Sequence, residues 1–421
     1  MKHGSKGKRM RRTRTMGLTG LTMAFTFLCF LLLFVKNGDL TAAAMSVGLS
    51  GAVWLITVII GGKFPSDRLL LCLTMFLCCV GIVILYRFDS RRGLTQTMNF
   101  LIGMGCMVIC ILFVKYAKKW GFFAPVIMAG SLGLLLLPVL FGHETNGAKN
   151  WIALAGVTFQ PSEVVKLALL CVLAYFLSRR KLILSGIYAG CCLIILMLQK
   201  DLGTALIYYG VTLIMMYVST GSVALVGIGL AGGAGAAVFG YQEFAHVRRR
   251  VAIWLDPWAD PAGDGYQIVQ GLIAMANGGA WGTGLGLGNA STIPYYYNDF
   301  AFSIILNEFG GIFGLLVLGL YLAVVLRGLM IAHRAETVFD TLLAVGCSAQ
   351  IGLQTFVIVG GNIKLIPLTG VTLPLISYGG TSLLSSLCVI GLLQGVAARV
   401  QAGVRRDRTL AGFDGEGGVG A

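Results

Sequence analysis

The chain has 421 residues, 57% of them hydrophobic and only 12% charged, and a formal net charge of +15. This composition excludes a soluble enzyme, because a soluble surface needs more polar side chains than this chain supplies. Much of the positive charge lies in the two tails and in short loops, where it is typical of an oriented membrane protein and does not indicate nucleic acid as a partner.

Apolar stretches of about 18 residues or more, each long enough to cross a hydrocarbon core of about 30 Å, recur along the chain. They predict an all-α polytopic membrane protein with about twelve transmembrane helices. The first stretch resembles a signal peptide, but no A-x-A-like cleavage site follows it and another span begins at once, so we expect a retained helix. The predicted spans are residues 16–36, 41–61, 69–86, 98–115, 122–141, 162–178, 182–198, 202–219, 222–242, 301–326, 339–361 and 377–398.

An even number of spans places both termini on the same side of the membrane. The N-terminal tail, residues 1–15, carries seven lysines and arginines, and four arginines lie in or next to the C-terminal tail, residues 400–421: Arg399, Arg405, Arg406 and Arg408. The positive-inside rule therefore predicts that both tails are cytoplasmic. Two long loops, about 142–161 and about 243–300, then face outward together with the short segment 362–376. Any chemistry is therefore expected on the outer face. Three arginines fall on that side against the rule: Arg87, Arg91 and Arg92.

The first outer loop leads into the predicted span 162–178 through a polar segment. Pro161 suits the first turn of a helix, and Glu163 and Lys166 follow on one helix face, three residues apart. Two interpretations of this pair stay open: a buried ion pair that fixes helix packing, or the polar wall of a cavity for a charged headgroup. Trp151, earlier in the loop, is by composition an interfacial anchor.

Aspartates also stand at the later breaks between apolar stretches. Asp201, beside Lys200, is expected to cap the following helix. Asp299 lies where the second long loop re-enters an apolar segment, and a carboxylate is costly at a membrane boundary, so it is a functional candidate. The other aspartates of this loop are predicted to form turns: Asp256, Asp260 and Asp264.

The second long loop holds two further patterns. Arg248, Arg249 and Arg250 follow a span directly, and guanidinium groups on the outer side suit bidentate binding of phosphate. The glycine-rich run 278–288 follows no predicted strand, so it does not indicate a nucleotide site. Closer to the C-terminus, the helix-breaking segment 367–382 is expected to line the same outer cavity, because irregular backbone at membrane depth is tolerated there.

Six short motifs, in this order, resemble those of the SEDS family of shape, elongation, division and sporulation proteins, typified by RodA and FtsW. The resemblance runs from about residue 69 to residue 399, close to four fifths of the chain. The six matches are G-A-x-x-W-I at 147–152, Q-P-S-E-x-x-K at 160–166, D-L-G-T-A at 201–205, D-P-W-A-D-P-x-G-x-G-Y-Q at 256–267, D-F-x-F at 299–302 and T-G-V-T-L-P-L-I-S-Y-G-G-T-S at 369–382.

This resemblance implies a SEDS-type bundle of ten helices over residues 69–399, with two additional helices at 16–61 and a large extracytoplasmic loop before the tenth of the twelve spans. It implies a multi-pass peptidoglycan glycosyltransferase of the bacterial cytoplasmic membrane, with lipid II as substrate and a class B penicillin-binding transpeptidase as partner. Such an enzyme forms β-1,4-linked glycan strands with inversion at the anomeric carbon, during elongation, division or sporulation. The polyprenyl tail of the substrate is expected to lie among membrane lipid between the helices.

The resemblance also implies roles for single residues. Asp299 matches the family's catalytic aspartate and is expected to be the base for the acceptor hydroxyl. Arg250, with Arg248 or Arg249 as substitutes, and Lys166 are candidate cations for the leaving diphosphate, and Glu163 is expected to hold Lys166 in place. Further residues are expected to bind substrate by their motif positions: Trp151, Gln160, Tyr266, Gln267 and Ser377.

The chain departs from the family pattern at two places near the outer cavity. Residues 295–298 read Y-Y-Y-N, where the family commonly has a proline–glutamate pair and a histidine or similar residue. Lys200 stands where the family has proline.

Two other functions compete with the transferase. A lipid II flippase or other transporter fits the intramembrane charges and broken helices, although no polar set at the cytoplasmic side is predicted to match the outer one. A non-catalytic scaffold that recruits a transpeptidase fits the helices, although the retained Asp299 argues against it. No metal site or cofactor is evident in the sequence, and a divalent cation bridging the diphosphate is an open alternative.

Overall fold

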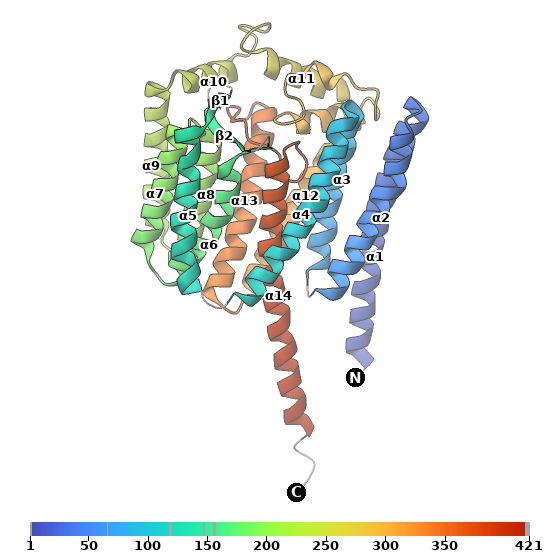
Figure 1. Ribbon diagram of the computed structural model, residues 1–421, viewed down its shortest axis with the longest axis vertical. Helices are drawn as coiled ribbons and strands as arrows, with labels where there is room; N and C mark the ends of the chain where they lie inside the picture. The colour runs from blue at the N-terminus through green and yellow to red at the C-terminus, as the bar shows by residue number, and fades with distance from the viewer. Residues whose placement is uncertain (1, 65, 118–119, 146–147, 155–156, 417–421) are drawn as a thin grey trace.

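The structure, a computed structural model, describes residues 2–64, 66–117, 120–145, 148–154 and 157–416. Most of its helices stand side by side along the long axis of the molecule (Figure 1). In these parts of the chain the helices are α1 (Lys2–Asn37), α2 (Leu40–Lys63), α3 (Arg68–Phe88), α4 (Ser90–Tyr116), α5 (Trp120–Phe141), α6 (Pro161–Ser178), α7 (Leu182–Leu198), α8 (Leu202–Thr220), α9 (Val223–Glu243), α10 (Ala245–Leu255), α11 (Tyr266–Gly278), α12 (Ala301–His333), α13 (Val338–Asn362) and α14 (Gly380–Glu416). The strands are β1 (His143–Thr145), β2 (Ala148–Leu154) and β3 (Val157–Phe159), and η1 is a 3-10 turn at Ala290–Thr292.

Eleven helices in the described part of the chain have the length and apolar composition needed to cross a membrane. They coincide with eleven of the twelve predicted spans. The twelfth, α7, has 17 residues and is also apolar. At 1.5 Å per residue it is about 26 Å long, close to the thickness of the hydrocarbon core. The predicted fold class, an all-α multi-pass membrane protein, is confirmed.

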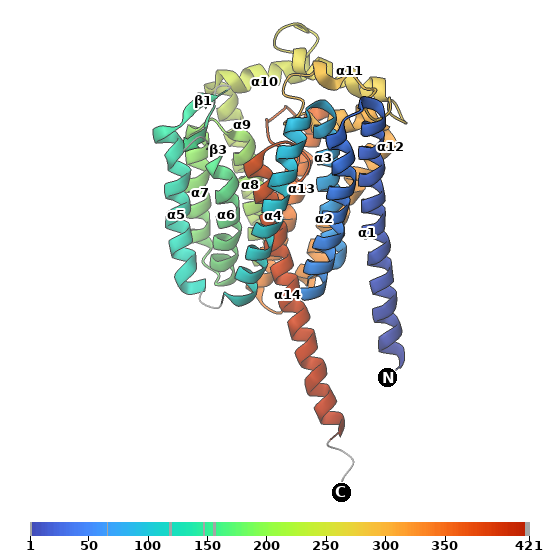
Figure 2. The same ribbon diagram turned by 45° about the vertical axis from the view of Figure 1, so that its right-hand side comes forward.

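Both termini lie at the same end of the bundle, as an even number of spans requires (Figures 1 and 2). We call this the terminal end and the opposite end the loop end. At the loop end, α10 and α11 run across the bundle and not along it (Figures 1 and 2). The sequence predicted only a long loop over residues 243–300. The two helices escaped that prediction because they have 11 and 13 residues and are too short to register as spans.

A small antiparallel sheet, in the order β1-β2-β3, fills the first outer loop. His143 pairs with Trp151, and Ile152 pairs with Phe159. The last strand leads to Pro161, the first residue of α6, where the missing N–H of proline leaves no donor unpaired. The sheet thereby sets the point at which α6, with Glu163 and Lys166 in its first turns, enters the bundle.

The helix α12 is broken at Gly310, whose φ of 84° and ψ of 171° are not helical. In a continuous helix the N–H groups of residues 311 and 312 would donate to the carbonyls of residues 307 and 308. Here Gly311 and Ile312 donate to the carbonyls of Gly279 and Ala280 at 2.9 and 3.2 Å. The freed carbonyls of Asn307 and Glu308 accept from the N–H groups of Thr283 and Gly284 at 2.9 and 3.0 Å. The glycine-rich run therefore replaces the lost helical hydrogen bonds.

A buried ion pair fixes this run to the rest of the bundle. Arg87, at the end of α3, lies 3.0 Å from the carboxylate of Glu308, whose side chain is fully buried. Arg87 also donates to the carbonyls of Gly286 and Gly288 at 3.0 and 2.8 Å, and Glu308 accepts from the N–H of Gly286 at 3.1 Å. Arg87, which violates the positive-inside rule, therefore has a structural partner. Arg92 likewise packs on the ring of Tyr297, with 3.7 Å from guanidinium to ring centre.

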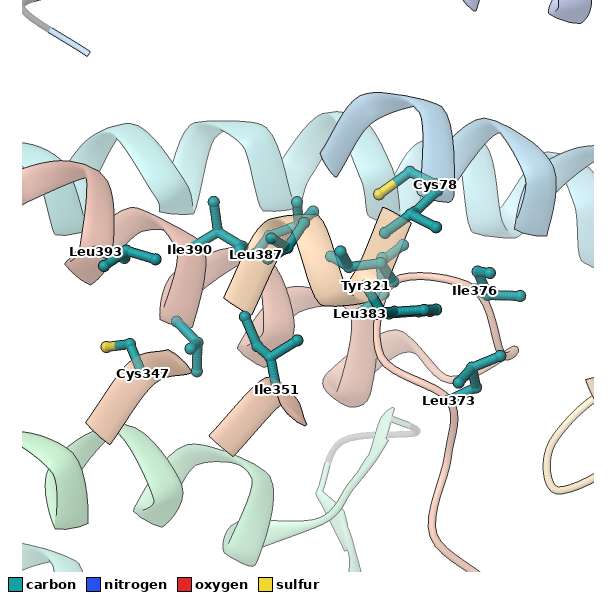
Figure 3. Close-up of a cluster of buried hydrophobic side chains, with 14 of the residues drawn as sticks. Cys78, Tyr321, Cys347, Ile351, Leu373, Ile376, Leu383, Leu387, Ile390 and Leu393 are labelled. Atoms are coloured by element: carbon teal, nitrogen blue, oxygen red, sulfur yellow. The ribbon is translucent and has the colours of Figure 1, made fainter. Parts of the chain in front are cut away.

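The hydrophobic core lies between α3, α12, α13 and α14, and the irregular segment 363–379 folds back into it. Cys78, Tyr321, Cys347, Ile351 and the α14 leucines meet there with Leu373 and Ile376 (Figure 3). Tyr321 donates from its hydroxyl to the carbonyl of Pro374. This packing holds the segment 363–379, which carries part of the candidate site, at membrane depth.

The first two helices pack as a hairpin against α3 and α12. Phe25 lies with its ring centre 5.0 Å from that of Phe76 and 6.0 Å from that of Phe313. At the loop end, the hydroxyl of Tyr86 donates to the carboxylate of Asp39 at 2.6 Å, and Lys36 donates to the carbonyl of Gly286. The hairpin is thus joined to the glycine-rich run as well as to the bundle.

The terminal end contains buried charges that the sequence did not predict. Asp67 pairs with Arg327 at 2.7 Å, and Asp340 pairs with Arg399 at 2.7 Å. We expected no charged groups at the terminal end to match those at the loop end. That expectation is wrong as regards the presence of charges. Each of these groups is, however, bound in an ion pair between two different helices or the residue that caps one, and Asp67 and Arg327 also line a small pocket at this end.

Candidate active site at the loop end

The segment 363–379 brings together side chains from several helices at the loop end. Ser377 is buried, and its hydroxyl donates to the carbonyl of Asn298 at 2.6 Å and accepts from the N–H of Leu373 at 2.9 Å. The N–H of Tyr378 donates to the carbonyl of Tyr297 at 2.8 Å. These bonds hold the backbone of Tyr297 and Asn298, directly before Asp299. Ser377, expected to bind substrate, lies where it positions the backbone beside Asp299.

Asp299 lies two residues before α12 and is held there through its backbone. The amide of Asn362 donates to the Asp299 carbonyl at 2.7 Å, and Ser303 donates to the oxygen of the same amide at 3.0 Å. The Asp299 side chain keeps part of its surface exposed but is surrounded by protein. Burial raises the pKa of the Asp299 carboxyl from its ordinary value of 3.8 to about 6, and the nearby charge of Arg250 opposes that rise.

Gly370 lies close to the side chains of both Asp299 and Arg250. It has a φ of +76°, a conformation that suits glycine, and a β-carbon built on it would lie 3.7 Å from Asp299 Oδ2 and 3.8 Å from Arg250 Nη2. The carboxylate and the guanidinium therefore reach the same small volume from two different elements. Arg250 is exposed and donates to the carbonyl of Leu368 at 3.2 Å.

The structure distinguishes the three consecutive arginines of α10. Arg248 donates to the backbone carbonyl of Gln242, and Arg249 forms an exposed bidentate pair with Asp264. Arg250 alone of the three faces the segment that holds Gly370. Asp264 lies in a turn, as predicted, and its side chain is the ion-pair partner of Arg249. Asp256 and Asp260 do form turns, accepting from the N–H groups of residues 258 and 263 at 3.0 Å.

Asp201 connects the first outer loop to α8. It caps the helix, as predicted, by accepting from the N–H of Thr204 at 3.2 Å. Its other oxygen accepts from the amides of Gln160 and Asn150 at 3.0 and 3.1 Å. Gln160, expected to bind substrate, therefore lies beside this cap. Asp201 joins β2 and the residue before α6 to the start of α8.

Glu163 and Lys166 form an ion pair inside the bundle, as their spacing allowed. Their charged atoms lie 2.5 Å apart, and the residues are 9% and 3% exposed. Ser385 of α14 donates to the Glu163 carboxylate, and Lys166 donates to the side chain of Gln354 at 3.3 Å. Gln354 in turn donates to the carbonyl of Thr372 at 2.9 Å. A polar network therefore runs from α6 through α13 to the segment 363–379.

The other expected substrate residues lie at the same end. Gln267, at the start of α11, donates to the carbonyl of Pro294 at 3.1 Å, and Tyr266 donates to that of Thr292 at 3.5 Å. Both bonds attach α11 to the loop that leads to Asp299. Trp151 is half-buried on β2. In the described residues, no group of three or more His, Cys, Asp or Glu side chains is arranged to hold a metal ion.

Two contributors to the site were not singled out from the sequence: Asn362 and Gln354. Gln354 carried a signal, because an amide inside an apolar span must find a hydrogen-bond partner. Asn362 is the last residue of α13, where a polar side chain is unremarkable. Gly370 was expected as one of the helix breakers of the segment 367–382, but its position between Asp299 and Arg250 was not predicted.

A family model described as "Cell cycle protein", for FtsW, RodA and SpoVE, matches residues 67–402. The chain is 35% identical over 377 residues to the peptidoglycan glycosyltransferase RodA of Mycobacterium tuberculosis, covering 81% of this chain and 79% of that one. It is 33% identical over 362 residues to the stage V sporulation protein E of Bacillus subtilis, covering 80% and 98%.

Solved structures agree with these matches. One comes from work on the structural coordination of polymerization and crosslinking by a peptidoglycan synthase complex, with a TM-score of 0.67, 27% identity and 80% and 98% of the two chains covered. Another is the rod shape determining protein RodA of Thermus thermophilus, with a TM-score of 0.59, 26% identity and 79% and 96% covered. The matched family region begins after α2.

Proposed function

The chain belongs to the family of FtsW, RodA and SpoVE, and from this membership we infer that it is a peptidoglycan glycosyltransferase of the membrane. Its substrate is lipid II, which it polymerises into β-1,4-linked glycan strands. Both termini are cytoplasmic and the loop end faces outward, because the tails, which carry these lysines and arginines, lie at the terminal end.

The observation that carries the mechanism is the convergence of Asp299 and Arg250 on one point beside Gly370. The donor sugar of lipid II is α-linked to its diphosphate and the product is β-linked, so a single displacement inverts the anomeric carbon. That displacement needs a base to take the proton of the acceptor hydroxyl and a cation to stabilise the departing diphosphate. Asp299, with its raised pKa, is the base, and Arg250 is the cation.

The buried network around Glu163 and Lys166 forms the inner wall of this site. It reaches the segment 363–379 through Gln354, so it supports the backbone that carries Gly370. Gln160 and Asp201 shape the mouth next to it. Trp151, Tyr266, Gln267 and Ser377 complete the surroundings, the last two by holding the backbone before α12.

A class B penicillin-binding transpeptidase is the proposed partner, because one of the similar solved structures belongs to a peptidoglycan synthase complex. A flippase is a weaker proposal. The terminal end carries charges, but the ion pairs Asp67–Arg327 and Asp340–Arg399 hold them between helices. A scaffold without activity does not require a carboxylate and a guanidinium at one point.

The purified protein, alone and with a co-expressed transpeptidase partner, is expected to convert lipid II into glycan chains. The products can be separated by length on a gel after removal of the stem peptides. Formation of chains in either preparation supports the transferase. If neither preparation forms chains while lipid II crosses a vesicle bilayer in the presence of the protein, the flippase is the correct function.

The polymerisation rate is also expected to depend on pH in a way set by Asp299. Only the deprotonated carboxylate accepts a proton, so the rate should rise with pH and level off above a midpoint near 6, the pKa to which burial raises this group. An unshifted aspartate would give a midpoint near 4. Initial rates between about pH 4.5 and about pH 8, with lipid II well below saturation so that kcat/KM reports the free enzyme, distinguish the two cases.

A further inference from the structure

Lys200 occupies an unusual position in the turn between α7 and α8. Its φ is +60°, in the left-handed region that side chains other than glycine seldom adopt. A proline could not adopt this angle, because its ring holds φ near about −65°.

The turn that carries Lys200 is packed against the segment that carries Gly370. A β-carbon on Gly203, three residues after Lys200, would lie 2.8 Å from the carbonyl oxygen of Thr369. Arg250 bonds the carbonyl of Leu368 on the same stretch. Residues 368–370 therefore have the α8 turn on one side and Arg250 with Asp299 on the other.

His246 of α10 lies within reach of both cations. Burial lowers the pKa of the His246 imidazole, and the positive charges of Arg250 and then Lys200 lower it further. Helix α10 crosses above the loop ends of α8 and α9 (Figures 1 and 2). The Nε2 atom of His246 is buried and has no hydrogen-bond partner among the residues that the structure describes. This nitrogen can therefore form a hydrogen bond with a group bound beside it.

We propose that Lys200, His246 and Arg250 together form the binding site for the diphosphate of the polyprenyl donor, with Lys200 as a second cation beside Arg250. The proposal rests on the proposed function and names the group that this site holds. A guanidinium engages one phosphate through paired hydrogen bonds, and an ammonium acts as a point charge on the other. The imidazole supplies a hydrogen bond between them.

The test is direct binding of undecaprenyl diphosphate and of undecaprenyl monophosphate to the purified full-length protein, followed by native mass spectrometry or thermophoresis. Asparagine tolerates left-handed backbone, so Lys200→Asn removes the charge and leaves the turn intact. We expect this variant to bind the diphosphate about tenfold more weakly and the monophosphate nearly as well as the wild type, since one charge-assisted contact is lost. Lys200→Arg is expected to stay within about twofold of wild type.

Arg180 offers a matched control. It also has a positive φ, of 58°, in a turn between two helices, α6 and α7, but at the terminal end. Arg180→Asn removes the same charge from the same kind of turn and is expected to leave both affinities unchanged.

Unchanged diphosphate affinity in Lys200→Asn would overturn the proposal, and so would an equal loss for both lipids. Because binding needs no turnover, a wild type that binds undecaprenyl diphosphate but forms no glycan would refute the transferase and not this site.

Discussion

Replacing Asp299 by asparagine is expected to reduce glycan polymerisation by about 100-fold to 10,000-fold, the usual contribution of a positioned general base. The amide has the shape of the carboxylate but cannot accept the proton of the acceptor hydroxyl. The position of the residue should not change, because Asn362 holds Asp299 by its backbone carbonyl and not by its side chain. The variant therefore separates chemistry from folding better than alanine does.

The melting temperature of Asp299→Asn should equal or slightly exceed that of the wild type. Burial disfavours the charged carboxylate, and the neutral amide does not carry that cost. Asp264→Asn is the matched control: it removes a carboxylate from the same end of the bundle, but an exposed one that binds Arg249. It should polymerise at nearly the wild-type rate. Full activity in Asp299→Asn, measured as glycan formed from lipid II, would remove Asp299 from the mechanism.

The sequence predicted those parts of the fold that depend on local composition. The spans followed from the thickness of the membrane, which requires long apolar helices. Asp201 was recognised as a cap because capping involves residues only three apart. Glu163 and Lys166 were recognised as a pair because residues at that spacing share a helix face. For the cap and the ion pair, the determining interaction lies within one helical turn.

The remaining features depend on contacts between distant segments. Arg87 and Glu308 are 221 residues apart, and nothing in either local sequence indicates that they meet. The glycine-rich run appeared only as a failed nucleotide motif, yet it supplies the hydrogen bonds that the break in α12 removes. The resemblance favoured Arg250 among three adjacent arginines but predicted no contact for it, and the packing of α10 against residue 368 distinguishes it from the other two. Such contacts are properties of the assembled bundle.

Replacing Lys166 by methionine is expected to destabilise the protein by about 3–5 kcal/mol, the cost of leaving one partner of a buried ion pair without its counter-ion. Methionine keeps most of the length of the lysine stem, so the loss falls on the charge. Glu163 would then retain the hydrogen bond from Ser385 but lose the ammonium 2.5 Å away. Unfolding followed by tryptophan fluorescence in detergent measures the effect. Arg399→Met is the control. It also breaks an ion pair inside the bundle, the one with Asp340, but at the terminal end and away from the candidate site.

The double variant Glu163→Gln, Lys166→Met decides between the two interpretations of this pair. Removing both charges eliminates the uncompensated carboxylate, so stability should return close to that of the wild type. If the pair only fixes the packing of α6 against α13 and α14, the double variant polymerises lipid II normally. We expect a stable protein with strongly reduced polymerisation, because Lys166 is connected through Gln354 to the segment that carries Gly370. A stable double variant with full activity would assign the pair to packing alone.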